Sequence, residues 1–232
     1  MQPISPASLL PADLAQALLV GRLWRDGPCV VAVRGGEVVD LTQTVATVAE
    51  LFERSDALDI ARHAPGIALG SVQALLAQAL AAPAGEPLLL APCDLQAVKA
   101  CGVTFAVSLL ERVIEEQAGG DAARAASLRT ALQTTLGGDL SALKPGSEAA
   151  QRLKQQLQQR GAWSQYMEVG IGPDAEVFTK AQPMSSVGCG AQVGLLPSSA
   201  WNNPEPEIVL AVNSRGEVLG ATLGNDVNLR DI

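Results

Sequence analysis

The segment 201–226 constrains the fold of this 232-residue chain more than any other part of it. Two apolar runs, 208–212 and 218–223, flank a short polar stretch that contains a glycine. Runs of this kind on either side of a glycine-containing break predict a β-hairpin. We expect Arg215 and Gly216 to form a two-residue turn, because glycine readily adopts the positive φ that such turns require.

Three carboxylates converge on one face of this predicted hairpin. In the register that the turn sets, Asp226 lies opposite Glu205 and Gly224 lies opposite Glu207. Alternation puts both glutamates on the same face, and directly opposed residues have Cβ atoms about 4.5–5.5 Å apart. Like charges this close repel unless a cation lies between them. An oxygen-only set suits a hard divalent ion, with Mg²⁺ first and Mn²⁺ or Ca²⁺ as further possibilities. The alternative is a row of solvated carboxylates on an exposed face.

The sequence around these acids resembles the E-x-E and N-D-x-S-x-R-D signatures of the fumarylacetoacetate hydrolase family. The matching stretches are 203–207 and 223–231, in which Asn228 stands where the family usually has Ser or Thr. The resemblance implies that the three acids hold a catalytic metal. We expect Arg230 to orient these carboxylates.

A second stretch, 102–111, matches the spacing of the family pattern G-x-N-Y-x-x-H-x-x-E. In the family, the His and the Glu lie one helical turn apart and activate a water. Here Glu111 is kept and Ser108 stands in the His position, so the water-activating pair is absent and we interpret this as a change of reaction. We expect Glu111 to be the base or its relay, and Thr104 to contact substrate. The alternative for Glu111 is an exposed helix carboxylate.

The expected anion-binding residue is Lys180. The stretch 178–180 resembles the family's F-x-K element, whose lysine points into the active site. It lies at the end of the segment 166–180, which we predict to be extended. A lysine placed there would neutralise a substrate carboxylate or an enolate oxygen. The alternative is a surface strand lysine.

The chain is expected to have the α+β fold class and to begin with a small N-terminal α/β domain, residues 1–90. A hairpin is predicted around the Gly35-Gly36 pair, and helices are predicted to begin at the capping residues Thr47 and Ser71.

Residues 91–232 correspond, by the resemblance, to a β-rich catalytic domain of the mixed β-roll type. A helical insertion at about 107–161 interrupts it, and its role as a lid, a subunit contact or a solvent-facing hairpin is open. The family's catalytic domain continues beyond the position of Ile232. The resemblance therefore implies a domain that is incomplete at its C-terminus and a fragment whose own activity is open.

Bulk composition limits the partners and the location. A hydrophobic content of 48% supports a sizeable core, and the net charge of −8 argues against a nucleic acid partner. No apolar run approaches the roughly 18 residues that a membrane span requires. The four cysteines form no zinc motif, and without a recognisable signal peptide we expect buried, reduced thiols in a cytoplasmic protein.

The resemblance implies a Mg²⁺-dependent enzyme that acts on a small 2-keto acid through a metal-stabilised enolate, and a homodimer for the intact protein. It is strongest for the bacterial branch that dehydrates L-2-keto-3-deoxyarabonate. Loss of a β-hydroxyl needs enolisation and an acid but no activated water, which agrees with Ser108. Two alternatives stay open. One is a C–C bond hydrolase or decarboxylase acting on acylpyruvates, and the other is a non-catalytic fragment or scaffold.

Overall fold

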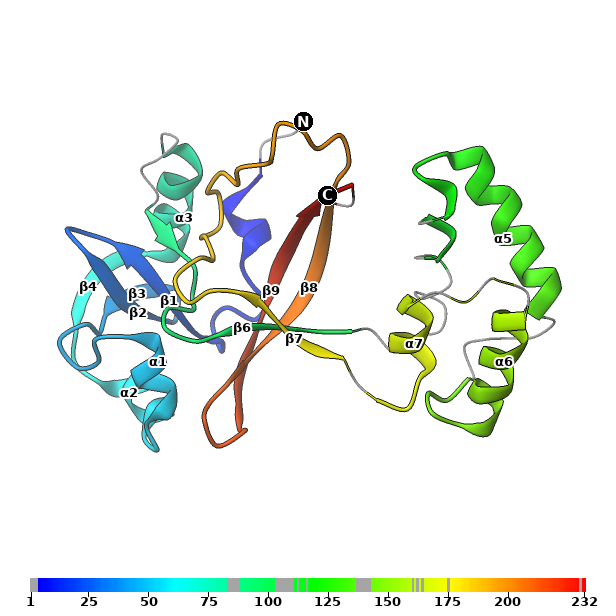
Figure 1. Cartoon of the computed structure of the whole chain (residues 1–232). Helices are drawn as coiled ribbons and strands as arrows, with labels where there is room; N and C mark the ends of the chain where they lie inside the picture. Colours follow the sequence, from blue (N-terminus) through cyan, green and yellow to red (C-terminus); the bar gives the residue numbers. More distant parts are fainter. Residues whose placement is uncertain are drawn as a thin grey trace. The chain divides into compact units, whose positions relative to one another are not determined.

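The computed structural model confirms the α+β fold class (Figure 1). By contacts the chain divides into two compact units, the first being Met1–Ala97 with Ala181–Ile232 and the second Val98–Lys180. The domain boundary expected near residue 90 stays a prediction, because units defined by contacts need not fold separately. The structure describes residues 4–82, 88–102, 111, 113–115, 117–136, 143–159, 161, 163, 165–174, 176–229 and 231–232.

The first unit is built on a five-stranded sheet with the order β4-β3-β2-β1-β5. A short 3₁₀ helix, η1 (Pro6–Leu9), precedes the sheet. Every pairing in the sheet is antiparallel, so α+β replaces the α/β label predicted for this part of the chain. The predicted Gly35-Gly36 turn is confirmed, with both glycines at positive φ. The strands are β1 (Leu18–Trp24), β2 (Pro28–Arg34), β3 (Glu37–Asp40), β4 (Ile67–Ser71) and β5 (Leu89–Leu90).

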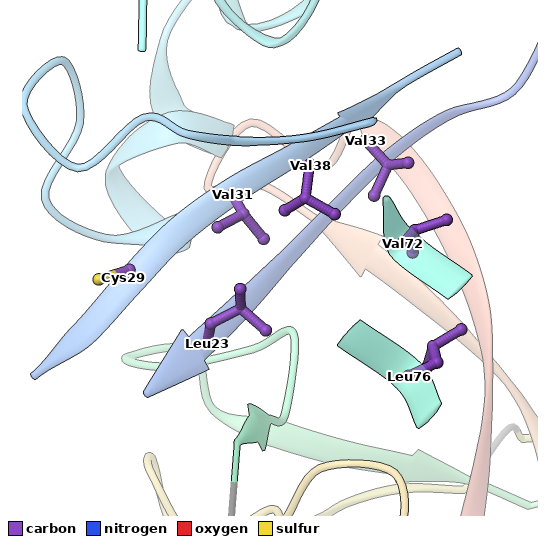
Figure 2. Packing of buried hydrophobic residues seen from close by; sticks show 7 residues of the cluster. All are labelled: Leu23, Cys29, Val31, Val33, Val38, Val72 and Leu76. Carbon is purple, nitrogen blue, oxygen red and sulfur yellow. The ribbon is translucent and has the colours of Figure 1, made fainter. Parts of the chain in front are cut away.

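Helices cover both faces of this sheet, which is why the central strand β2 is buried along most of its length. On one face, Val31 and Val33 pack with residues of α3 (Val72–Ala81), as Figure 2 shows. On the other face, Val30 and Ala32 pack with residues of α1 (Val48–Glu53) and α2 (Ala57–His63). Because side chains alternate along a strand, successive residues of β2 belong to two separate apolar clusters.

The capping residues predicted from the sequence are confirmed. The Thr47 hydroxyl accepts a hydrogen bond from the Glu50 amide at 2.9 Å, where α1 begins. The Ser71 hydroxyl accepts one from the Ala74 amide at 3.2 Å, where α3 begins. Each contact satisfies an amide that the first helical turn would otherwise leave without a partner.

A buried ion pair joins distant parts of the first unit. The side chains of Arg22 and Asp94 are 7% and 3% exposed, and Arg22 Nε lies 3.5 Å from Asp94 Oδ2. The Asp94 carboxylate also accepts hydrogen bonds from the amides of Val48 and Ala49, at the N-terminus of α1. Its backbone carbonyl accepts from the Met184 amide at 2.9 Å. One residue thus links the sheet, a helix and the segment that comes after the second unit.

The second unit combines a two-stranded sheet with helices. The strands are β6 (Val98–Cys101) and β7 (Val177–Ala181), and the helices with defined bounds are α5 (Ala122–Leu136), α6 (Glu148–Gln159) and α7 (Gln165–Ile171). Both α5 and α6 lie within the helical insertion that is expected at about 107–161. The expected start of this insertion lies outside the described residues, whereas 113–115 are helical.

The prediction of extended structure from residue 166 is wrong for its first part, because α7 covers Gln165–Ile171. Met167 and Ile171, four residues apart, are buried against Val113 and Leu157. This spacing places both side chains on one face of a helix, where they complete the apolar cluster of the second unit. Only the part from Val177 onward is a strand.

Among the helices that the structure describes, none is long and apolar enough to cross a bilayer.

All four cysteines are free, and Cys29 is buried, but Cys101 and Cys189 are exposed. The expectation of buried thiols is therefore wrong for these two residues.

Candidate functional site

The predicted hairpin forms, with the predicted pairing at the acidic residues. Its strands are β8 (Asn202–Val212) and β9 (Val218–Leu229), which Figure 1 shows as two long strands, in orange and red, that form a two-stranded ribbon. Glu205 pairs with Asp226, and Glu207 pairs with Gly224. The backbone thus places the three acids at adjoining positions on one face, as the sequence predicts.

The turn differs from the prediction. Asn213 and Glu217 close a three-residue loop, in which the Asn213 carbonyl accepts from the Gly216 amide at 3.0 Å. The Asn213 amide donates to the Glu217 carbonyl at 3.1 Å. Gly216 has φ +78°, so it is the left-handed residue of a loop built on a type I turn. The expected two-residue turn of Arg215 and Gly216 is therefore wrong.

A bulge next to this loop restores the predicted register. Val212 pairs with Val218, whereas the next pair joins Ala211 to Gly220. Leu219 is the extra residue on its strand, and it shifts the pairing by one position. The longer loop shifts the pairing by one position and the bulge shifts it back. The acidic pairs therefore lie where a two-residue turn would have put them.

The two faces of the hairpin differ in exposure. Glu205, Glu207 and Asp226 are half-buried. On the other face Ile208 and Leu223, which pair with each other, are 75% and 82% exposed. The acids therefore lie on the more sheltered side, which weakens the alternative of a fully solvated carboxylate row.

The tip of the hairpin docks on the C-terminal end of α1. The Glu53 carboxylate accepts from the amide and the hydroxyl of Ser214, at 2.8 and 2.7 Å. Arg215 donates to the Glu53 carbonyl at 3.0 Å. The bonds from Ser214, followed by the charge of Arg215, lower the pKa of Glu53. These contacts fix the tip of the hairpin against α1.

The opposite, open end of the hairpin is closed by Asp231, a residue to which the sequence assigned no role. Its carboxylate accepts from the Ser199 hydroxyl at 2.6 Å and from the amides of Ala200 and Trp201 at 2.6 and 3.1 Å. These bonds, led by that of Ser199, lower the pKa of Asp231. The only signal in the sequence was its place at the end of the 223–231 motif.

The ligand chemistry and the register fit a hard divalent cation, but the side chains are not gathered as a metal centre. Within the part of the chain that the structure describes, no group of three or more His, Cys, Asp or Glu side chains is placed to hold a metal. A Cβ at Gly224 would come within 2.8 Å of a Val209 methyl, so no side chain could extend beside Glu207 without displacing that methyl. The metal assignment of Glu205, Glu207 and Asp226 stays a prediction.

Glu111 lies in the second unit and forms an ion pair that the sequence did not indicate. Both of its carboxylate oxygens accept from the Arg129 guanidinium on α5, one of them at 2.9 Å from Nε. The side chain is 42% exposed. The hydrogen bonds from Arg129 lower the pKa of Glu111. A carboxylate held in this way is a weaker base than a free one.

Lys180 is exposed on β7, with its ammonium group 5.9 Å from the centre of the Phe178 ring. Its exposure agrees with the alternative of a surface strand lysine, and its role in anion binding is untested. The other residues expected at the site, Thr104, Ser108 and Arg230, lie outside the described residues.

A groove of about 360 Å³ lies elsewhere in the first unit, between α3 and the sheet. Its lining contains no carboxylate, so it does not suit a divalent cation. The lining residues are Leu23, Arg25, Ala68, Leu69, Leu75, Gln78 and Leu88.

Comparison with known proteins gives two short matches, both to sugar-acid dehydratases. One is a probable 2-keto-3-deoxyxylonate dehydratase of Haloferax volcanii, 42% identical over 67 residues, which are 29% of this chain and 23% of that protein. The other is a 2-dehydro-3-deoxy-D-arabinonate dehydratase of Saccharolobus solfataricus, 40% identical over 57 residues, 25% of this chain and 19% of that protein. The match thus spans less than a quarter of each relative. No protein-family profile and no solved structure matches the chain.

Proposed function

We propose that the full-length protein dehydrates a 2-keto-3-deoxy sugar acid, of the L-2-keto-3-deoxyarabonate type, with a divalent cation held by Glu205, Glu207 and Asp226. Mg²⁺ is the first choice, and Mn²⁺ or Ca²⁺ would suit the same oxygen ligands. The observation that carries the proposal is the pairing of Glu205 with Asp226, with Glu207 next on the same face. The two similar proteins, both named as dehydratases of such acids, support the reaction class.

The proposed reaction removes a proton from C3 of the substrate and expels the C4 hydroxyl as water, and the resulting enone tautomerises to the semialdehyde as hydrogens leave C5 and its hydroxyl and are added at C3 and C4. A bound divalent cation would supply Lewis-acid chemistry, because it stabilises negative charge that develops on the keto oxygen. The protein then has to supply a base and a proton donor, but no activated water. Ser108 in place of histidine agrees with the absence of an activated water, because serine is too poor a base at neutral pH to activate one.

Roles for the remaining residues follow from their chemistry. Lys180 would bind the anionic end of the substrate, because an ammonium group neutralises a carboxylate. Thr104 would contact the substrate, and Arg230 would orient the metal-site carboxylates. The bidentate pair with Arg129 lowers the basicity of Glu111, which supports a relay role over that of the base itself.

A product assay on the full-length protein tests the reaction. We expect an unbranched semialdehyde that retains every carbon of a 2-keto-3-deoxy pentonate, formed only with Mg²⁺ or Mn²⁺ present. Pyruvate or CO₂ as the product would instead indicate the C–C hydrolase or decarboxylase that the fumarylacetoacetate hydrolase resemblance also allows. Binding of the keto acid without turnover would indicate a non-catalytic scaffold.

A pair of variants on the same hairpin tests the site. Glu205→Gln removes one charged ligand and should abolish cation-dependent turnover, whereas Glu217→Gln, at the tip, should retain it. Undiminished turnover in Glu205→Gln would overturn the ligand assignment. The homodimer implied by the family resemblance and the expected cytoplasmic location stay predictions and do not affect this test.

A further inference from the structure

At the open end of the hairpin, a side chain binds the backbone of the opposite strand. Among the described residues, Asn202 and Leu229 form the outermost backbone pair. In the same register, the residue opposite Ala200 is Asp231. Its carboxylate accepts from the Ala200 and Trp201 amides and from the Ser199 hydroxyl, so one side chain continues the ladder across both strands. We call this contact the Asp231 clasp.

A side-chain contact at that end matters because backbone pairing alone holds the end of a ribbon weakly. A two-stranded hairpin is marginally stable alone, and the terminal pairs of a ribbon open most readily. Exposed apolar residues lie on both faces, Val209 on the face of the acids and Ile208 on the other, so no buried cluster among the described residues covers the strands. The tip is held separately, through the contacts of Ser214 with Glu53.

The acidic pair lies close to the open end. Glu205 and Asp226 form the fourth pair counted from Asn202 and Leu229. Their separation therefore depends on whether the strands stay paired at this end, whereas the tip contacts lie many residues away. Fraying of the first pairs would allow the two carboxylates to move apart.

We propose that Asp231 is a positioning residue, which locks the open end of the hairpin and thereby sets the separation of Glu205 and Asp226. The effect on cation binding rests on the proposed function, whereas the effect on the hairpin does not. The lowered pKa of Asp231 agrees with this role, because the carboxylate stays charged at neutral pH and accepts all three bonds.

Amide hydrogen exchange, read residue by residue, tests the structural part. In Asp231→Ala, we expect exchange at Ala200 and Trp201 and at Asn202, Asn203 and Glu205 to accelerate roughly tenfold or more, with the tip amides unchanged; Pro204 and Pro206 have no amide hydrogen. Asp231→Asn keeps one oxygen acceptor and should restore part of the protection. Asp59→Ala, which removes an exposed carboxylate on α2, is the control and should change nothing at the hairpin.

Unchanged exchange at the open end of Asp231→Ala would overturn the proposal, as would an equal loss of protection at the tip. If Asp231→Ala does not fold, Ser199→Ala removes one of the three bonds and gives the same test in a milder form. It should accelerate exchange at the open end alone, and no change there would count against the clasp.

Titration with Mn²⁺ separates this inference from the proposed function. We expect Asp231→Ala to weaken Mn²⁺ binding about tenfold, as loss of a supporting contact to a metal site does, and Glu205→Gln to weaken it about a hundredfold or more. If Glu205→Gln binds Mn²⁺ like the wild type, the proposed function fails and the exchange data alone decide the clasp. If Glu205→Gln loses binding while Asp231→Ala keeps it, the positioning role fails and the metal site stands.

Discussion

Glu111 shows how a single contact changes the chemistry open to a residue. By its place in the sequence it is expected to be a base or a relay. The Arg129 guanidinium contacts both of its oxygens, which stabilises the charged form and lowers its pKa. The partner is 18 residues away on another helix, so neither spacing nor composition pointed to it.

Replacing Arg129 tests this account of Glu111. Arg129→Gln removes the cation, so the pKa of Glu111 should rise toward its ordinary value in an NMR titration. Because the pair depresses that pKa in the folded state, its stabilising effect is present above the ordinary carboxylate pKa and is lost as the pH falls through the depressed value. The stability difference between wild type and variant should therefore be largest near neutral pH and vanish in acid.

Arg124→Gln provides a matched control, because it removes an exposed arginine from the first turn of the same helix. This variant should leave the pKa of Glu111 unchanged from that in the wild type. An unaltered Glu111 pKa in Arg129→Gln would contradict the importance of the ion pair.

At the residue level, the sequence predicted the features that local periodicity sets and missed those that depend on distant partners. The shared face of Glu205 and Glu207 results from alternation along one strand. The Asp231 clasp and the buried pair of Arg22 with Asp94 each join residues 30 or more positions apart. Such pairs are set by tertiary packing, and a single sequence contains no signal for them.

At the element level, the hairpin was predicted in kind and in register but not at its turn. The prediction treated the glycine as part of a two-residue turn, and the chain instead uses a three-residue loop with a bulge at Leu219. Both solutions give the same pairing at Glu205. The segment 166–180 was predicted to be extended, and α7 was missed because Met167 and Ile171 are buried against residues of other helices, a contact set by tertiary packing.

Gly216 offers a direct test of the loop. Because it has φ +78°, Gly216→Ala should weaken the hairpin by about 1–2 kcal/mol, the usual cost of a left-handed residue with a side chain. The loss should show as faster exchange of the Asn213 amide, which closes the loop. Gly220→Ala is the matched control on β9, where a Cβ meets nothing within 4 Å and φ is not positive. Equal exchange rates of the Asn213 amide in the two variants would contradict the loop geometry.

At the level of the whole molecule, the first unit combines two stretches separated by the second unit in the sequence. Asp94 is central to this joining. It pairs with Arg22 in the sheet, accepts from the amides that begin α1, and binds the Met184 amide through its carbonyl. The α+β class could be predicted from the order of elements, but this mode of joining could not.

Asp94→Ala should therefore lower the free energy of unfolding of the protein by about 3–5 kcal/mol, because it leaves a buried Arg22 without its counter-charge. It also removes the acceptor of the Val48 and Ala49 amides. Urea unfolding measures the effect. Asp56→Ala, which breaks an exposed pair with Arg54, should leave stability close to that of the wild type. A similar stability for both variants would contradict the joining role of Asp94.

The measurement that bears most directly on the hairpin site is a Mn²⁺ titration of the full-length protein by calorimetry, comparing wild type with Glu205→Gln and Asp226→Asn. These two residues pair across the strands, and each should contribute a charged oxygen ligand. We predict one bound ion per chain in the wild type and in the Glu217→Gln control. We predict an affinity lower by about a hundredfold or more in each of the other two variants. Equal affinity in all four proteins would contradict the assignment of the cation to this face of the hairpin.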